Sequence, residues 1–310
     1  MAEPVRVLYV MGHGWSGSTI LGNLLGELEG FFHAGELRRL WGEALPSGAP
    51  CGCGAPIGDC PVWSKVLAHP SVASLDPAQV DRWHRAVRVR RTPRLLRFRR
   101  GARWGDLDRY LDAGRRLYGA VAEVTGARVI VDTSKRAGDA AALLLMTEVE
   151  PFFVHLVRDP RAVAQSWARR PEGGIGPVAT ARDWTAFNLL DEALRARAGR
   201  DRSMRLRYED LVAGPAWSLR SVARLAGEEP ATLPLRADHV ALLGVNHGVM
   251  GNPSRFVTGE VPLRQDDEWK RALSGTGRWT VTALTLPLLP RYGYPVWTGR
   301  GGDHDRRRLP

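Results

Sequence analysis

The stretch Met11–Ile20, MGHGWSGSTI, decides the fold of this chain. It follows the apolar, β-branched run Val5–Val10 and leads into Gly17–Leu28, where apolar residues recur with a helical period. A strand, a glycine-rich loop and a helix in this order open a βαβ unit. The first turn of such a helix offers its unpaired N–H groups to an anion. The stretch therefore predicts a phosphate-binding loop at the end of a buried strand.

One position of this loop departs from the usual phosphate-loop pattern G-x-x-x-x-G-K-[ST]. Ser18 stands where the pattern has a lysine. The glycines still let backbone N–H groups turn inward, and Ser16, Ser18 and Thr19 add hydroxyl donors. The missing ammonium is the group that reaches the β- and γ-phosphates of a nucleoside triphosphate. We therefore expect a phosphate-bearing ligand that is not a hydrolysed triphosphate.

Strands and helices alternate along the rest of the chain, which predicts an α/β fold with a doubly wound, mostly parallel sheet. We expect a single domain over residues 1–310. The loops that follow the strands should converge on one crevice, because ligands bind at the carboxyl ends of parallel strands. The expected elements after the first helix are strands Phe31–Ala34, Arg128–Asp132, Phe152–Val157 and Ser203–Arg207, and helices Ala137–Thr147 and Arg161–Arg169.

Residues from about 46 to 125 interrupt this alternation and look like an insertion or lid. Pro46–Cys60 is rich in glycine and proline and predicts a loop. Asp76–Thr125 is mostly helical in pattern and rich in arginine, with breaks expected near Thr92-Pro93 and Gly101. At the other end of the chain, residues from about 299 to 310 predict a disordered tail.

The charge balance points to an anionic partner, since 44 Lys and Arg face 33 Asp and Glu, for a net charge of +11. No apolar run is long enough to span a bilayer, and the N-terminus lacks a signal-peptide pattern, so we expect a cytoplasmic protein with no membrane partner. The arginines between Arg82 and Arg116 lie in a stretch that predicts isolated basic helices, which are weak evidence for binding of nucleic acid. We therefore expect no nucleic-acid partner, although binding of nucleic acid by this stretch is the non-enzymatic alternative.

Three cysteines occur close together, Cys51, Cys53 and Cys60. An odd number of cysteines in a cytoplasmic chain argues against a disulfide framework. Three thiolates and a fourth ligand can hold zinc, and His69 is the nearest histidine in sequence. The C-x-C spacing is tighter than the usual C-x2-C, so the sequence favours reduced thiols in a loop and no metal.

A second anion motif is Leu156–Ser166, LVRDPRAVAQS, in which Arg158 follows a strand and Ser166 lies two turns into the next helix. An arginine fork and a hydroxyl that converge in this way make a phosphate clamp. With both motifs in view, the chain resembles the sulfotransferases that use 3'-phosphoadenosine 5'-phosphosulfate (PAPS), in particular bacterial, tyrosylprotein and small-molecule members. Gly14–Ile20 resembles that family's 5'-phosphosulfate loop, and Leu156–Ser166 its 3'-phosphate motif.

Two further segments resemble the same family, Arg207–Leu211 and Gly251–Phe256, the latter as the loop that closes over the cofactor. The resemblance implies a P-loop-like sulfotransferase fold, PAPS as the donor and PAP as the product. The residues that it implies for cofactor binding are Gly14, Trp15, Ser16, Gly17, Ser18, Thr19, Arg158, Ser166, Tyr208 and Arg255.

Trp15 is a departure, because many family members carry Lys or Arg there to help the bridging oxygen leave. Lys135, which follows a core strand, is the residue that we expect to supply this positive charge instead. The alternative interpretation is a solvated lysine near a helix N-terminus. For the base that activates the acceptor hydroxyl we expect Glu36, which resembles the catalytic glutamate of tyrosylprotein sulfotransferases. Its alternative role is a carboxylate that the helix dipole stabilises. His33 is the second choice for the base, and we expect it to be a core histidine instead.

The expected reaction is transfer of a sulfuryl group to a hydroxyl of a small molecule or glycan by in-line displacement. The alternative is a kinase-like phosphotransferase of the P-loop class, against which the missing lysine counts. Tryptophans of the insertion either stack on a ring of the acceptor or belong to the core: Trp41, Trp63, Trp83 and Trp104.

Overall fold

The computed structural model describes residues 3–98, 104–170 and 174–296. The chain divides into two compact units, Met1–Arg158 with Ala186–Asp266, and Asp159–Thr185 with Asp267–Pro310. The single domain over residues 1–310 stays a prediction, and residues 299–310 and Gly101 lie outside the described residues.

The first unit is built on a parallel sheet of five strands among the described residues, in the order β2-β3-β1-β4-β5. The chain starts in the middle strand, moves to one side for β2 and β3, and then to the other side for β4 and β5. The direction in which successive strands are added to the sheet therefore reverses at β1. The loop after β1 lies at this topological switch point. The strands are β1 (Val5–Met11), β2 (Phe31–Gly35), β3 (Val129–Lys135), β4 (Val149–Val157) and β5 (Ser203–Arg207).

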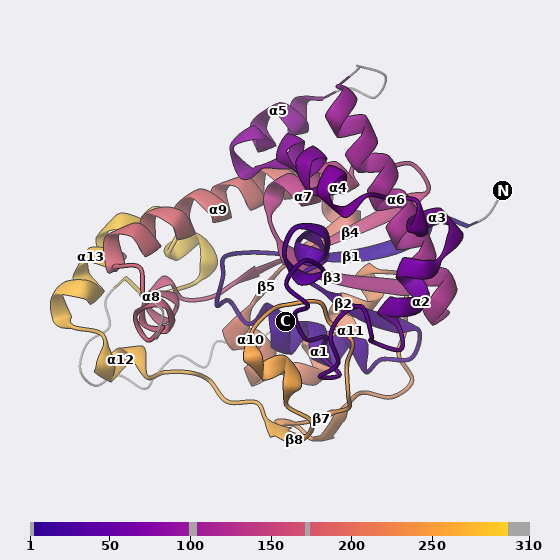
Figure 1. Ribbon diagram of the computed structural model, residues 1–310. Coiled ribbons are helices and arrows are strands. Elements are labelled where there is room, and N and C mark those ends of the chain that lie inside the picture. Colours follow the sequence, from indigo (N-terminus) through magenta and orange to yellow (C-terminus); the bar gives the residue numbers. More distant parts are fainter. Residues whose placement is uncertain (1–2, 99–103, 171–173, 297–310) are drawn as a thin grey trace. The chain divides into compact units, whose positions relative to one another are not determined.

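Side chains alternate between the two faces of the sheet and enter two separate cores. On β1, Val7 and Tyr9 face one core while Leu8 and Val10 face the other. The first core is shared with α6 (Gly105–Thr125) and α7 (Ala137–Leu143), and the second with α1 (Ser18–Gly26) and α11 (Pro215–Leu225). Figure 1 shows helices on both faces of these strands. This two-faced burial explains why the strands are nearly continuous apolar runs.

The predicted α/β fold with a doubly wound, mostly parallel sheet is confirmed. Most predicted elements are present with shifted ends, and the strand Ser203–Arg207 matches residue for residue. The first helix stops at Gly26 and not at Leu28, and the helix after β3 stops at Leu143 and not at Thr147. The strand predicted from Phe152 starts three residues earlier, at Val149.

The insertion between β2 and β3 has the predicted loop followed by short helices. Thr92-Pro93 does not break a helix but begins one, because proline is well tolerated in a first helical turn. Its elements are η1 (Leu37–Arg39), the π-helical turn η2 (Leu40–Ala44), α2 (Trp63–Ala68), α3 (Pro70–Ala73), α4 (Pro77–His84), η3 (Arg85–Val87), η4 (Val89–Arg91), α5 (Thr92–Arg97) and α6.

A small antiparallel sheet that the sequence did not predict follows α11. It consists of β6 (Leu235–Ala237), β7 (Val240–Leu243) and β8 (Gly259–Pro262), in that order. These strands are only three or four residues long, which is too short for a periodic pattern to stand out. The remaining elements of the first unit are η5 (Arg200–Arg202), α10 (Tyr208–Ala213) and η6 (Pro253–Phe256).

The second unit is helical, and α8 (Pro160–Ala168) packs against α12 (Trp269–Ala272) and α13 (Gly275–Thr285). The long helix α9 (Pro177–Ala198) carries the chain from this unit to the first, and η7 (Pro290–Tyr292) follows α13. Within the described part of the chain, no helix combines the length and the apolar character that crossing a bilayer demands.

Helix α1 is fixed against β2 by a glycine contact that yields a stability prediction. A Cβ on Gly22 would lie 2.3 Å from Nε2 of His33, and a Cβ on Gly26 would lie 2.8 Å from Cβ of the same residue. His33 is buried, and a close-packed interior leaves little free space into which its ring can shift. Gly22→Ala should therefore lower the free energy of unfolding by about 1–3 kcal/mol, measured by urea denaturation.

Gly119→Ala is the matched control, because Gly119 lies inside α6 and a Cβ there would have nothing within 4 Å. Alanine is the better helix former, so this variant should be neutral or up to about 1 kcal/mol more stable. Equal stability of the two variants would show that α1 does not depend on the close approach to His33.

Candidate active site

The loop after β1 is held in a conformation that only certain residues allow. Gly12 has a φ of 142° and lies so close to β4 that a Cβ would be 2.3 Å from the Leu156 carbonyl oxygen. Trp15 adopts a left-handed backbone with a φ of 67°, and Gly17 follows at 91°. Non-glycine residues in this region are strained, and such strain collects at functional sites.

The start of α1 faces the end of this loop with donors available. Gly17 is the N-cap residue, no side chain caps the helix, and no acidic residue lies in its first turn. Within the described part of the chain, no atom bonds to the buried hydroxyl of Ser16. A buried polar group without a partner calls for an explanation, and an anion at the helix N-terminus provides one.

The other loop residues have contacts of their own. The carbonyl of Gly14 lies 2.9 Å from Nδ1 of His13, and the hydroxyl of Thr19 accepts a bond of 3.4 Å from the Asn252 amide. Ser18, the first residue of α1, is buried. The loop is thus braced from several sides, which is what close binding of an anion demands.

Glu36 and Lys135, at the carboxyl ends of the neighbouring strands β2 and β3, form a buried ion pair. Nζ of Lys135 donates to Oε1 of Glu36 at 2.6 Å and to the Thr133 carbonyl at 3.1 Å. Lys135 reaches this position with a left-handed backbone, φ 70°. Arg38 and Arg39 lie 3.7 Å from the second oxygen of Glu36. A solvated role for the lysine does not match this burial.

The charges of the pair set the pKa of each member. Burial alone would raise the pKa of Glu36, but the Lys135 ammonium, with Arg38 and Arg39, outweighs burial and holds the pKa below its usual range. Burial lowers the pKa of Lys135, and the Glu36 carboxylate offsets only part of this effect. We conclude that the carboxylate is firmly ionised at neutral pH and that the ammonium depends on its partner for its charge.

The loop and the ion pair belong to the same site. Lys135 is the strand partner of Met11, the last residue of β1. Gly251 lies between the two parts, since a Cβ there would be 3.7 Å from Oγ1 of Thr19 and 3.9 Å from Oε1 of Glu36. The structure thus brings together Gly14–Thr19, Glu36 and Lys135, as expected from loops at the carboxyl edge of one parallel sheet.

Arg158 lies directly against the same loop. It donates 2.8 Å hydrogen bonds to the Trp15 carbonyl and to a carboxylate oxygen of Asp266. Its guanidinium also stacks on the ring of Tyr208, 4.7 Å from the centroid, and that ring packs on Gly17. Asp266 was not predicted from the sequence, because its contact with Arg158 joins two residues that are 108 positions apart. A phosphate that reached Arg158 would have to compete with this carboxylate.

The two other residues expected to bind the cofactor are placed differently. Ser166 belongs to the second unit, where its hydroxyl donates to the Ala162 carbonyl at 3.0 Å. Arg255 is buried and donates to the carbonyls of Gly251 and Pro50. Arg255 therefore joins two loops of the first unit, and a cofactor role for either residue stays a prediction.

His33 is a core histidine, as expected. It is buried between α1 and β3, and burial and the Lys135 charge lower the pKa of its imidazole to about 3. The imidazole is therefore neutral at physiological pH. Glu36 is the acid–base candidate that reaches Lys135.

A buried polar cluster adjoins the site on the insertion side. Tyr118 donates to Asp132 at 2.7 Å, and Tyr110 donates to Asp139 at 2.9 Å. Burial raises the pKa of Asp132 to about 6. The cluster borders a cavity of about 40 Å³, which has room for a water-sized group. This cavity is lined by Arg38 and Ser134, which flank the ion pair in sequence.

The tryptophans of the insertion are mostly structural. Trp63 is fully buried and Trp41 nearly so, and Trp41 lines the cavity. Trp83 and Trp104 pack partly against the core and have arginines over their rings, Arg109 at 6.0 Å and Arg94 at 4.1 Å. The arginine-rich stretch therefore covers its own aromatic rings in part, which favours the core role for these two tryptophans.

The three cysteines do lie together, but not with His69. His69 bonds to Ser71 and Glu123, while His247 lies beside the thiols. The nearest histidine in sequence is thus not the nearest in space, a difference of loop topology that no spacing pattern reveals.

The sequence and the fold place the chain among known proteins. The family model described as "Sulfotransferase family" matches residues 8–231. The chain therefore belongs to the sulfotransferase family, as the resemblance predicted, and this membership counts against the kinase alternative. No curated protein matches the chain significantly.

Solved structures show the same fold. The sulfotransferase domain from the olefin synthase of Synechococcus PCC 7002 has a TM-score of 0.55 and 17% identity, covering 95% of this chain and 97% of that chain. The sulfotransferase domain from the curacin biosynthetic pathway has a TM-score of 0.58 and 16% identity, covering 95% and 99%. At these identities the likeness concerns the fold alone.

The low pKa of His33 predicts a pH dependence of stability. An unfolded chain binds a proton on this imidazole near pH 6.5, whereas the folded chain does so only near pH 3. The unfolded state thus binds more protons between these values, so His33 lowers the free energy of unfolding as the pH falls from about 6.5 toward 3. Above this window it has no effect. NMR titration of the histidine rings should show a ring that is still neutral at pH 5 and whose signal His33→Gln removes, beside the likewise buried His155 ring, which stays in that variant. A His33 ring that titrates near pH 6.5 would contradict its burial.

Proposed function

We propose that this sulfotransferase takes its sulfuryl group from PAPS and transfers it to a hydroxyl of a small molecule or glycan. The observation that carries the proposal is the buried Lys135–Glu36 ion pair, 2.6 Å long, beside the end of β1. A cation and a carboxylate at this place are what an in-line transfer between two oxygens demands: one for the charge on the leaving oxygen and one for the proton of the acceptor.

The loop is suited to the 5' end of the donor. Backbone N–H groups at the start of α1, with Ser16 and Ser18, would hold the phosphosulfate, and Thr19 would add a further hydroxyl. PAPS has no γ-phosphate, so a lysine at position 18 is not needed. Arg158 would hold the 3'-phosphate, with the ring of Tyr208 at one side of the guanidinium.

The ion pair supports distinct roles for its two members. When bound, PAPS supplies the sulfuryl group and leaves as PAP. Glu36 would accept the proton of the acceptor hydroxyl, and Lys135 would hold its positive charge beside the bridging oxygen, in place of the cation that Trp15 does not provide. A Glu36 carboxylate clamped by Lys135 is a weak base, so a shift of the ammonium from Glu36 toward the donor would strengthen the base at the moment of transfer.

The role of Glu36 predicts the behaviour of Glu36→Gln. With radiolabelled PAPS and a panel of hydroxyl acceptors, the variant should lose sulfotransfer by about 100-fold or more, because the proton acceptor is gone. PAP binding, measured by calorimetry, should stay near normal. Glu123→Gln makes the same change of charge at an exposed position and should keep full activity.

Two outcomes would speak against this proposal in different ways. Unchanged turnover of Glu36→Gln would remove Glu36 from the base role while leaving the donor assignment intact. Binding of ATP and Mg²⁺ without any binding of PAP to the unaltered chain would overturn the donor assignment itself.

The arginine site predicts a pair of opposite effects on PAP affinity. Arg158→Ala should weaken binding by about 30-fold, since a charge-assisted bond contributes about 2 kcal/mol. Asp266→Asn should strengthen binding by up to about fivefold, because a half-exposed competing carboxylate is neutralised. Calorimetric titration with PAP measures both.

Arg128→Gln serves as the control for loss of one positive charge, because Arg128 pairs with Glu228 at the amino end of β3. It should leave PAP affinity unchanged. If Arg158→Ala bound PAP as tightly as this control, the 3'-phosphate would lie elsewhere.

A further inference from the structure

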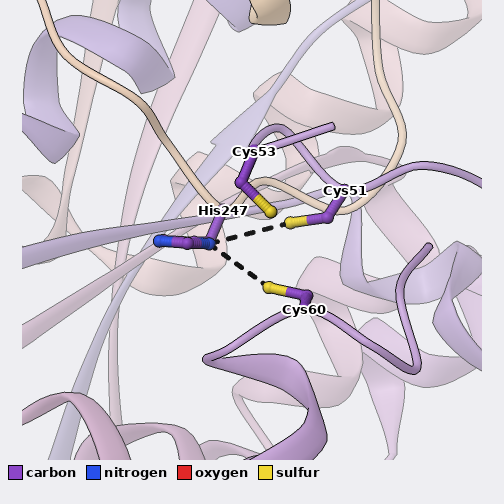
Figure 2. A group of neighbouring side chains, drawn as sticks. All are labelled: Cys51, Cys53, Cys60 and His247. Carbon is purple, nitrogen blue, oxygen red and sulfur yellow. Dashed lines mark hydrogen bonds between the residues drawn. The ribbon is translucent and has the colours of Figure 1, made fainter. Parts of the chain in front are cut away.

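A cluster of three cysteines and one histidine lies apart from the residues of the proposed reaction. Cys51, Cys53 and Cys60 come from the loop before α2, and His247 comes from the segment between β7 and β8. Their possible ligand atoms all lie within 4.8 Å of one another. Figure 2 shows the three sulfur atoms and the imidazole edge pointing toward a common centre.

We propose that these four side chains bind a structural zinc ion. Nδ1 of His247 lies 3.2 Å from Sγ of Cys60 and 3.9 Å from Sγ of Cys51. In a tetrahedral zinc site the ligand atoms lie about 3.5–3.8 Å apart, since Zn–S and Zn–N bonds are about 2.3 Å and 2.0 Å long. The observed spacings bracket these values, so small side-chain adjustments would close the site.

The types of the four ligands indicate which metal binds and whether its role is structural or catalytic. Thiolates with one imidazole suit zinc, and four protein ligands fill its tetrahedral shell without leaving a position for water or substrate. The site is therefore a structural one. It is separate from the chemistry of sulfuryl transfer.

The glycines between the cysteines explain how a C-x-C spacing can work here. A Cβ on Gly52 would lie 2.1 Å from a side-chain oxygen of Asn246 and 2.8 Å from its backbone oxygen, so the loop approaches the His247 segment as only glycine permits. Gly54 has a φ of 90°, which turns the chain sharply after Cys53. Both positions bend the loop around the centre of the cluster.

The charge near the cluster complements a metal–thiolate centre. Three thiolates and Zn²⁺ sum to a net negative charge. The buried guanidinium of Arg255 donates to the carbonyl of Pro50, the residue before Cys51, at 3.3 Å. This arrangement also gives Arg255 a structural reason to be there.

A zinc ion here would join segments that are distant in sequence. The indole of Trp63 donates to the His247 carbonyl at 2.6 Å, and the Gly52 amide donates to Gly248 at 3.1 Å. The next residue, Val249, pairs with the end of β2 next to Glu36. The ion would thus fix the insertion to the strand end that carries Glu36.

The test is the zinc content of the full-length chain, purified under reducing conditions without chelator and measured by mass spectrometry. We expect one bound zinc per chain, released by a mercurial reagent that modifies the thiols. After removal of the metal, Co²⁺ added alone should give the visible absorption of tetrahedral cobalt with thiolate ligands. Zinc should raise the melting temperature of the metal-free protein, because it binds the folded chain.

Three variants decide which residues hold the ion. His247→Gln should lose the zinc, whereas the matched variant His69→Gln should keep it. Cys53→Ser should also lose it, and because Cys53 is the least buried of the three cysteines, this variant should stay folded by circular dichroism.

The proposal is overturned if the unaltered chain with three reactive thiols fails to take up zinc, if iron and sulfide are found in its place, or if folded Cys53→Ser and His247→Gln both keep full zinc. None of these measurements involves PAPS or an acceptor. The zinc assignment therefore stands or falls separately from the proposed donor and base.

Discussion

The pairing of Val249 with the end of β2 is the constraint on which the site depends. The Glu36 amide donates to Val249 at 2.7 Å, and the Val249 amide donates to Ala34 at 2.9 Å. Gly35 makes this approach possible, because a Cβ there would lie 2.3 Å from the Val249 nitrogen. The segment on one side of Val249 carries His247, and the segment on the other side carries Gly251 and Asn252, which face Thr19 and Glu36. One short stretch of backbone thus connects the loop after β1, the Glu36 carboxylate and the cysteine cluster.

Charge buried close to this pairing shapes the chemistry. A lysine and a glutamate taken out of water cost free energy that their mutual attraction must offset, so the pair is weak evidence for stability. In the proposed reaction, each charge would hold the other until the substrates bind. The strained backbones of Trp15 and Lys135, both left-handed, lie in the two segments that flank the proposed donor site.

Local patterns predicted the framework well, because each depends on residues close in sequence. The apolar run before Gly12 and the helical period after it predicted β1 and α1. The alternation of strands and helices predicted that the loops lie at one edge of the sheet. Glu36 and Lys135 were predicted as candidates because each comes at the end of a strand and resembles a residue of related sulfotransferases, and the structure places them side by side. His247, Asp266 and the short antiparallel strands were missed, since each acquires its role from a partner more than a hundred residues away or from a segment too short to show a period.

The sequence by itself determined the fold class and the loops that meet at the carboxyl edge of the sheet, and the resemblance of two of these loops to known motifs indicated the family. It did so because glycine spacing and apolar periodicity act over a few residues and are written directly in the chain. Only the tertiary structure decided that Lys135 pairs with Glu36 and that Asp266 forms an ion pair with Arg158. It also decided that His247, and not His69, lies beside the three cysteines. These contacts depend on the paths of long loops. The entropic cost of closing a loop changes only slowly with its length, so the sequence does not show which distant residues a loop brings together.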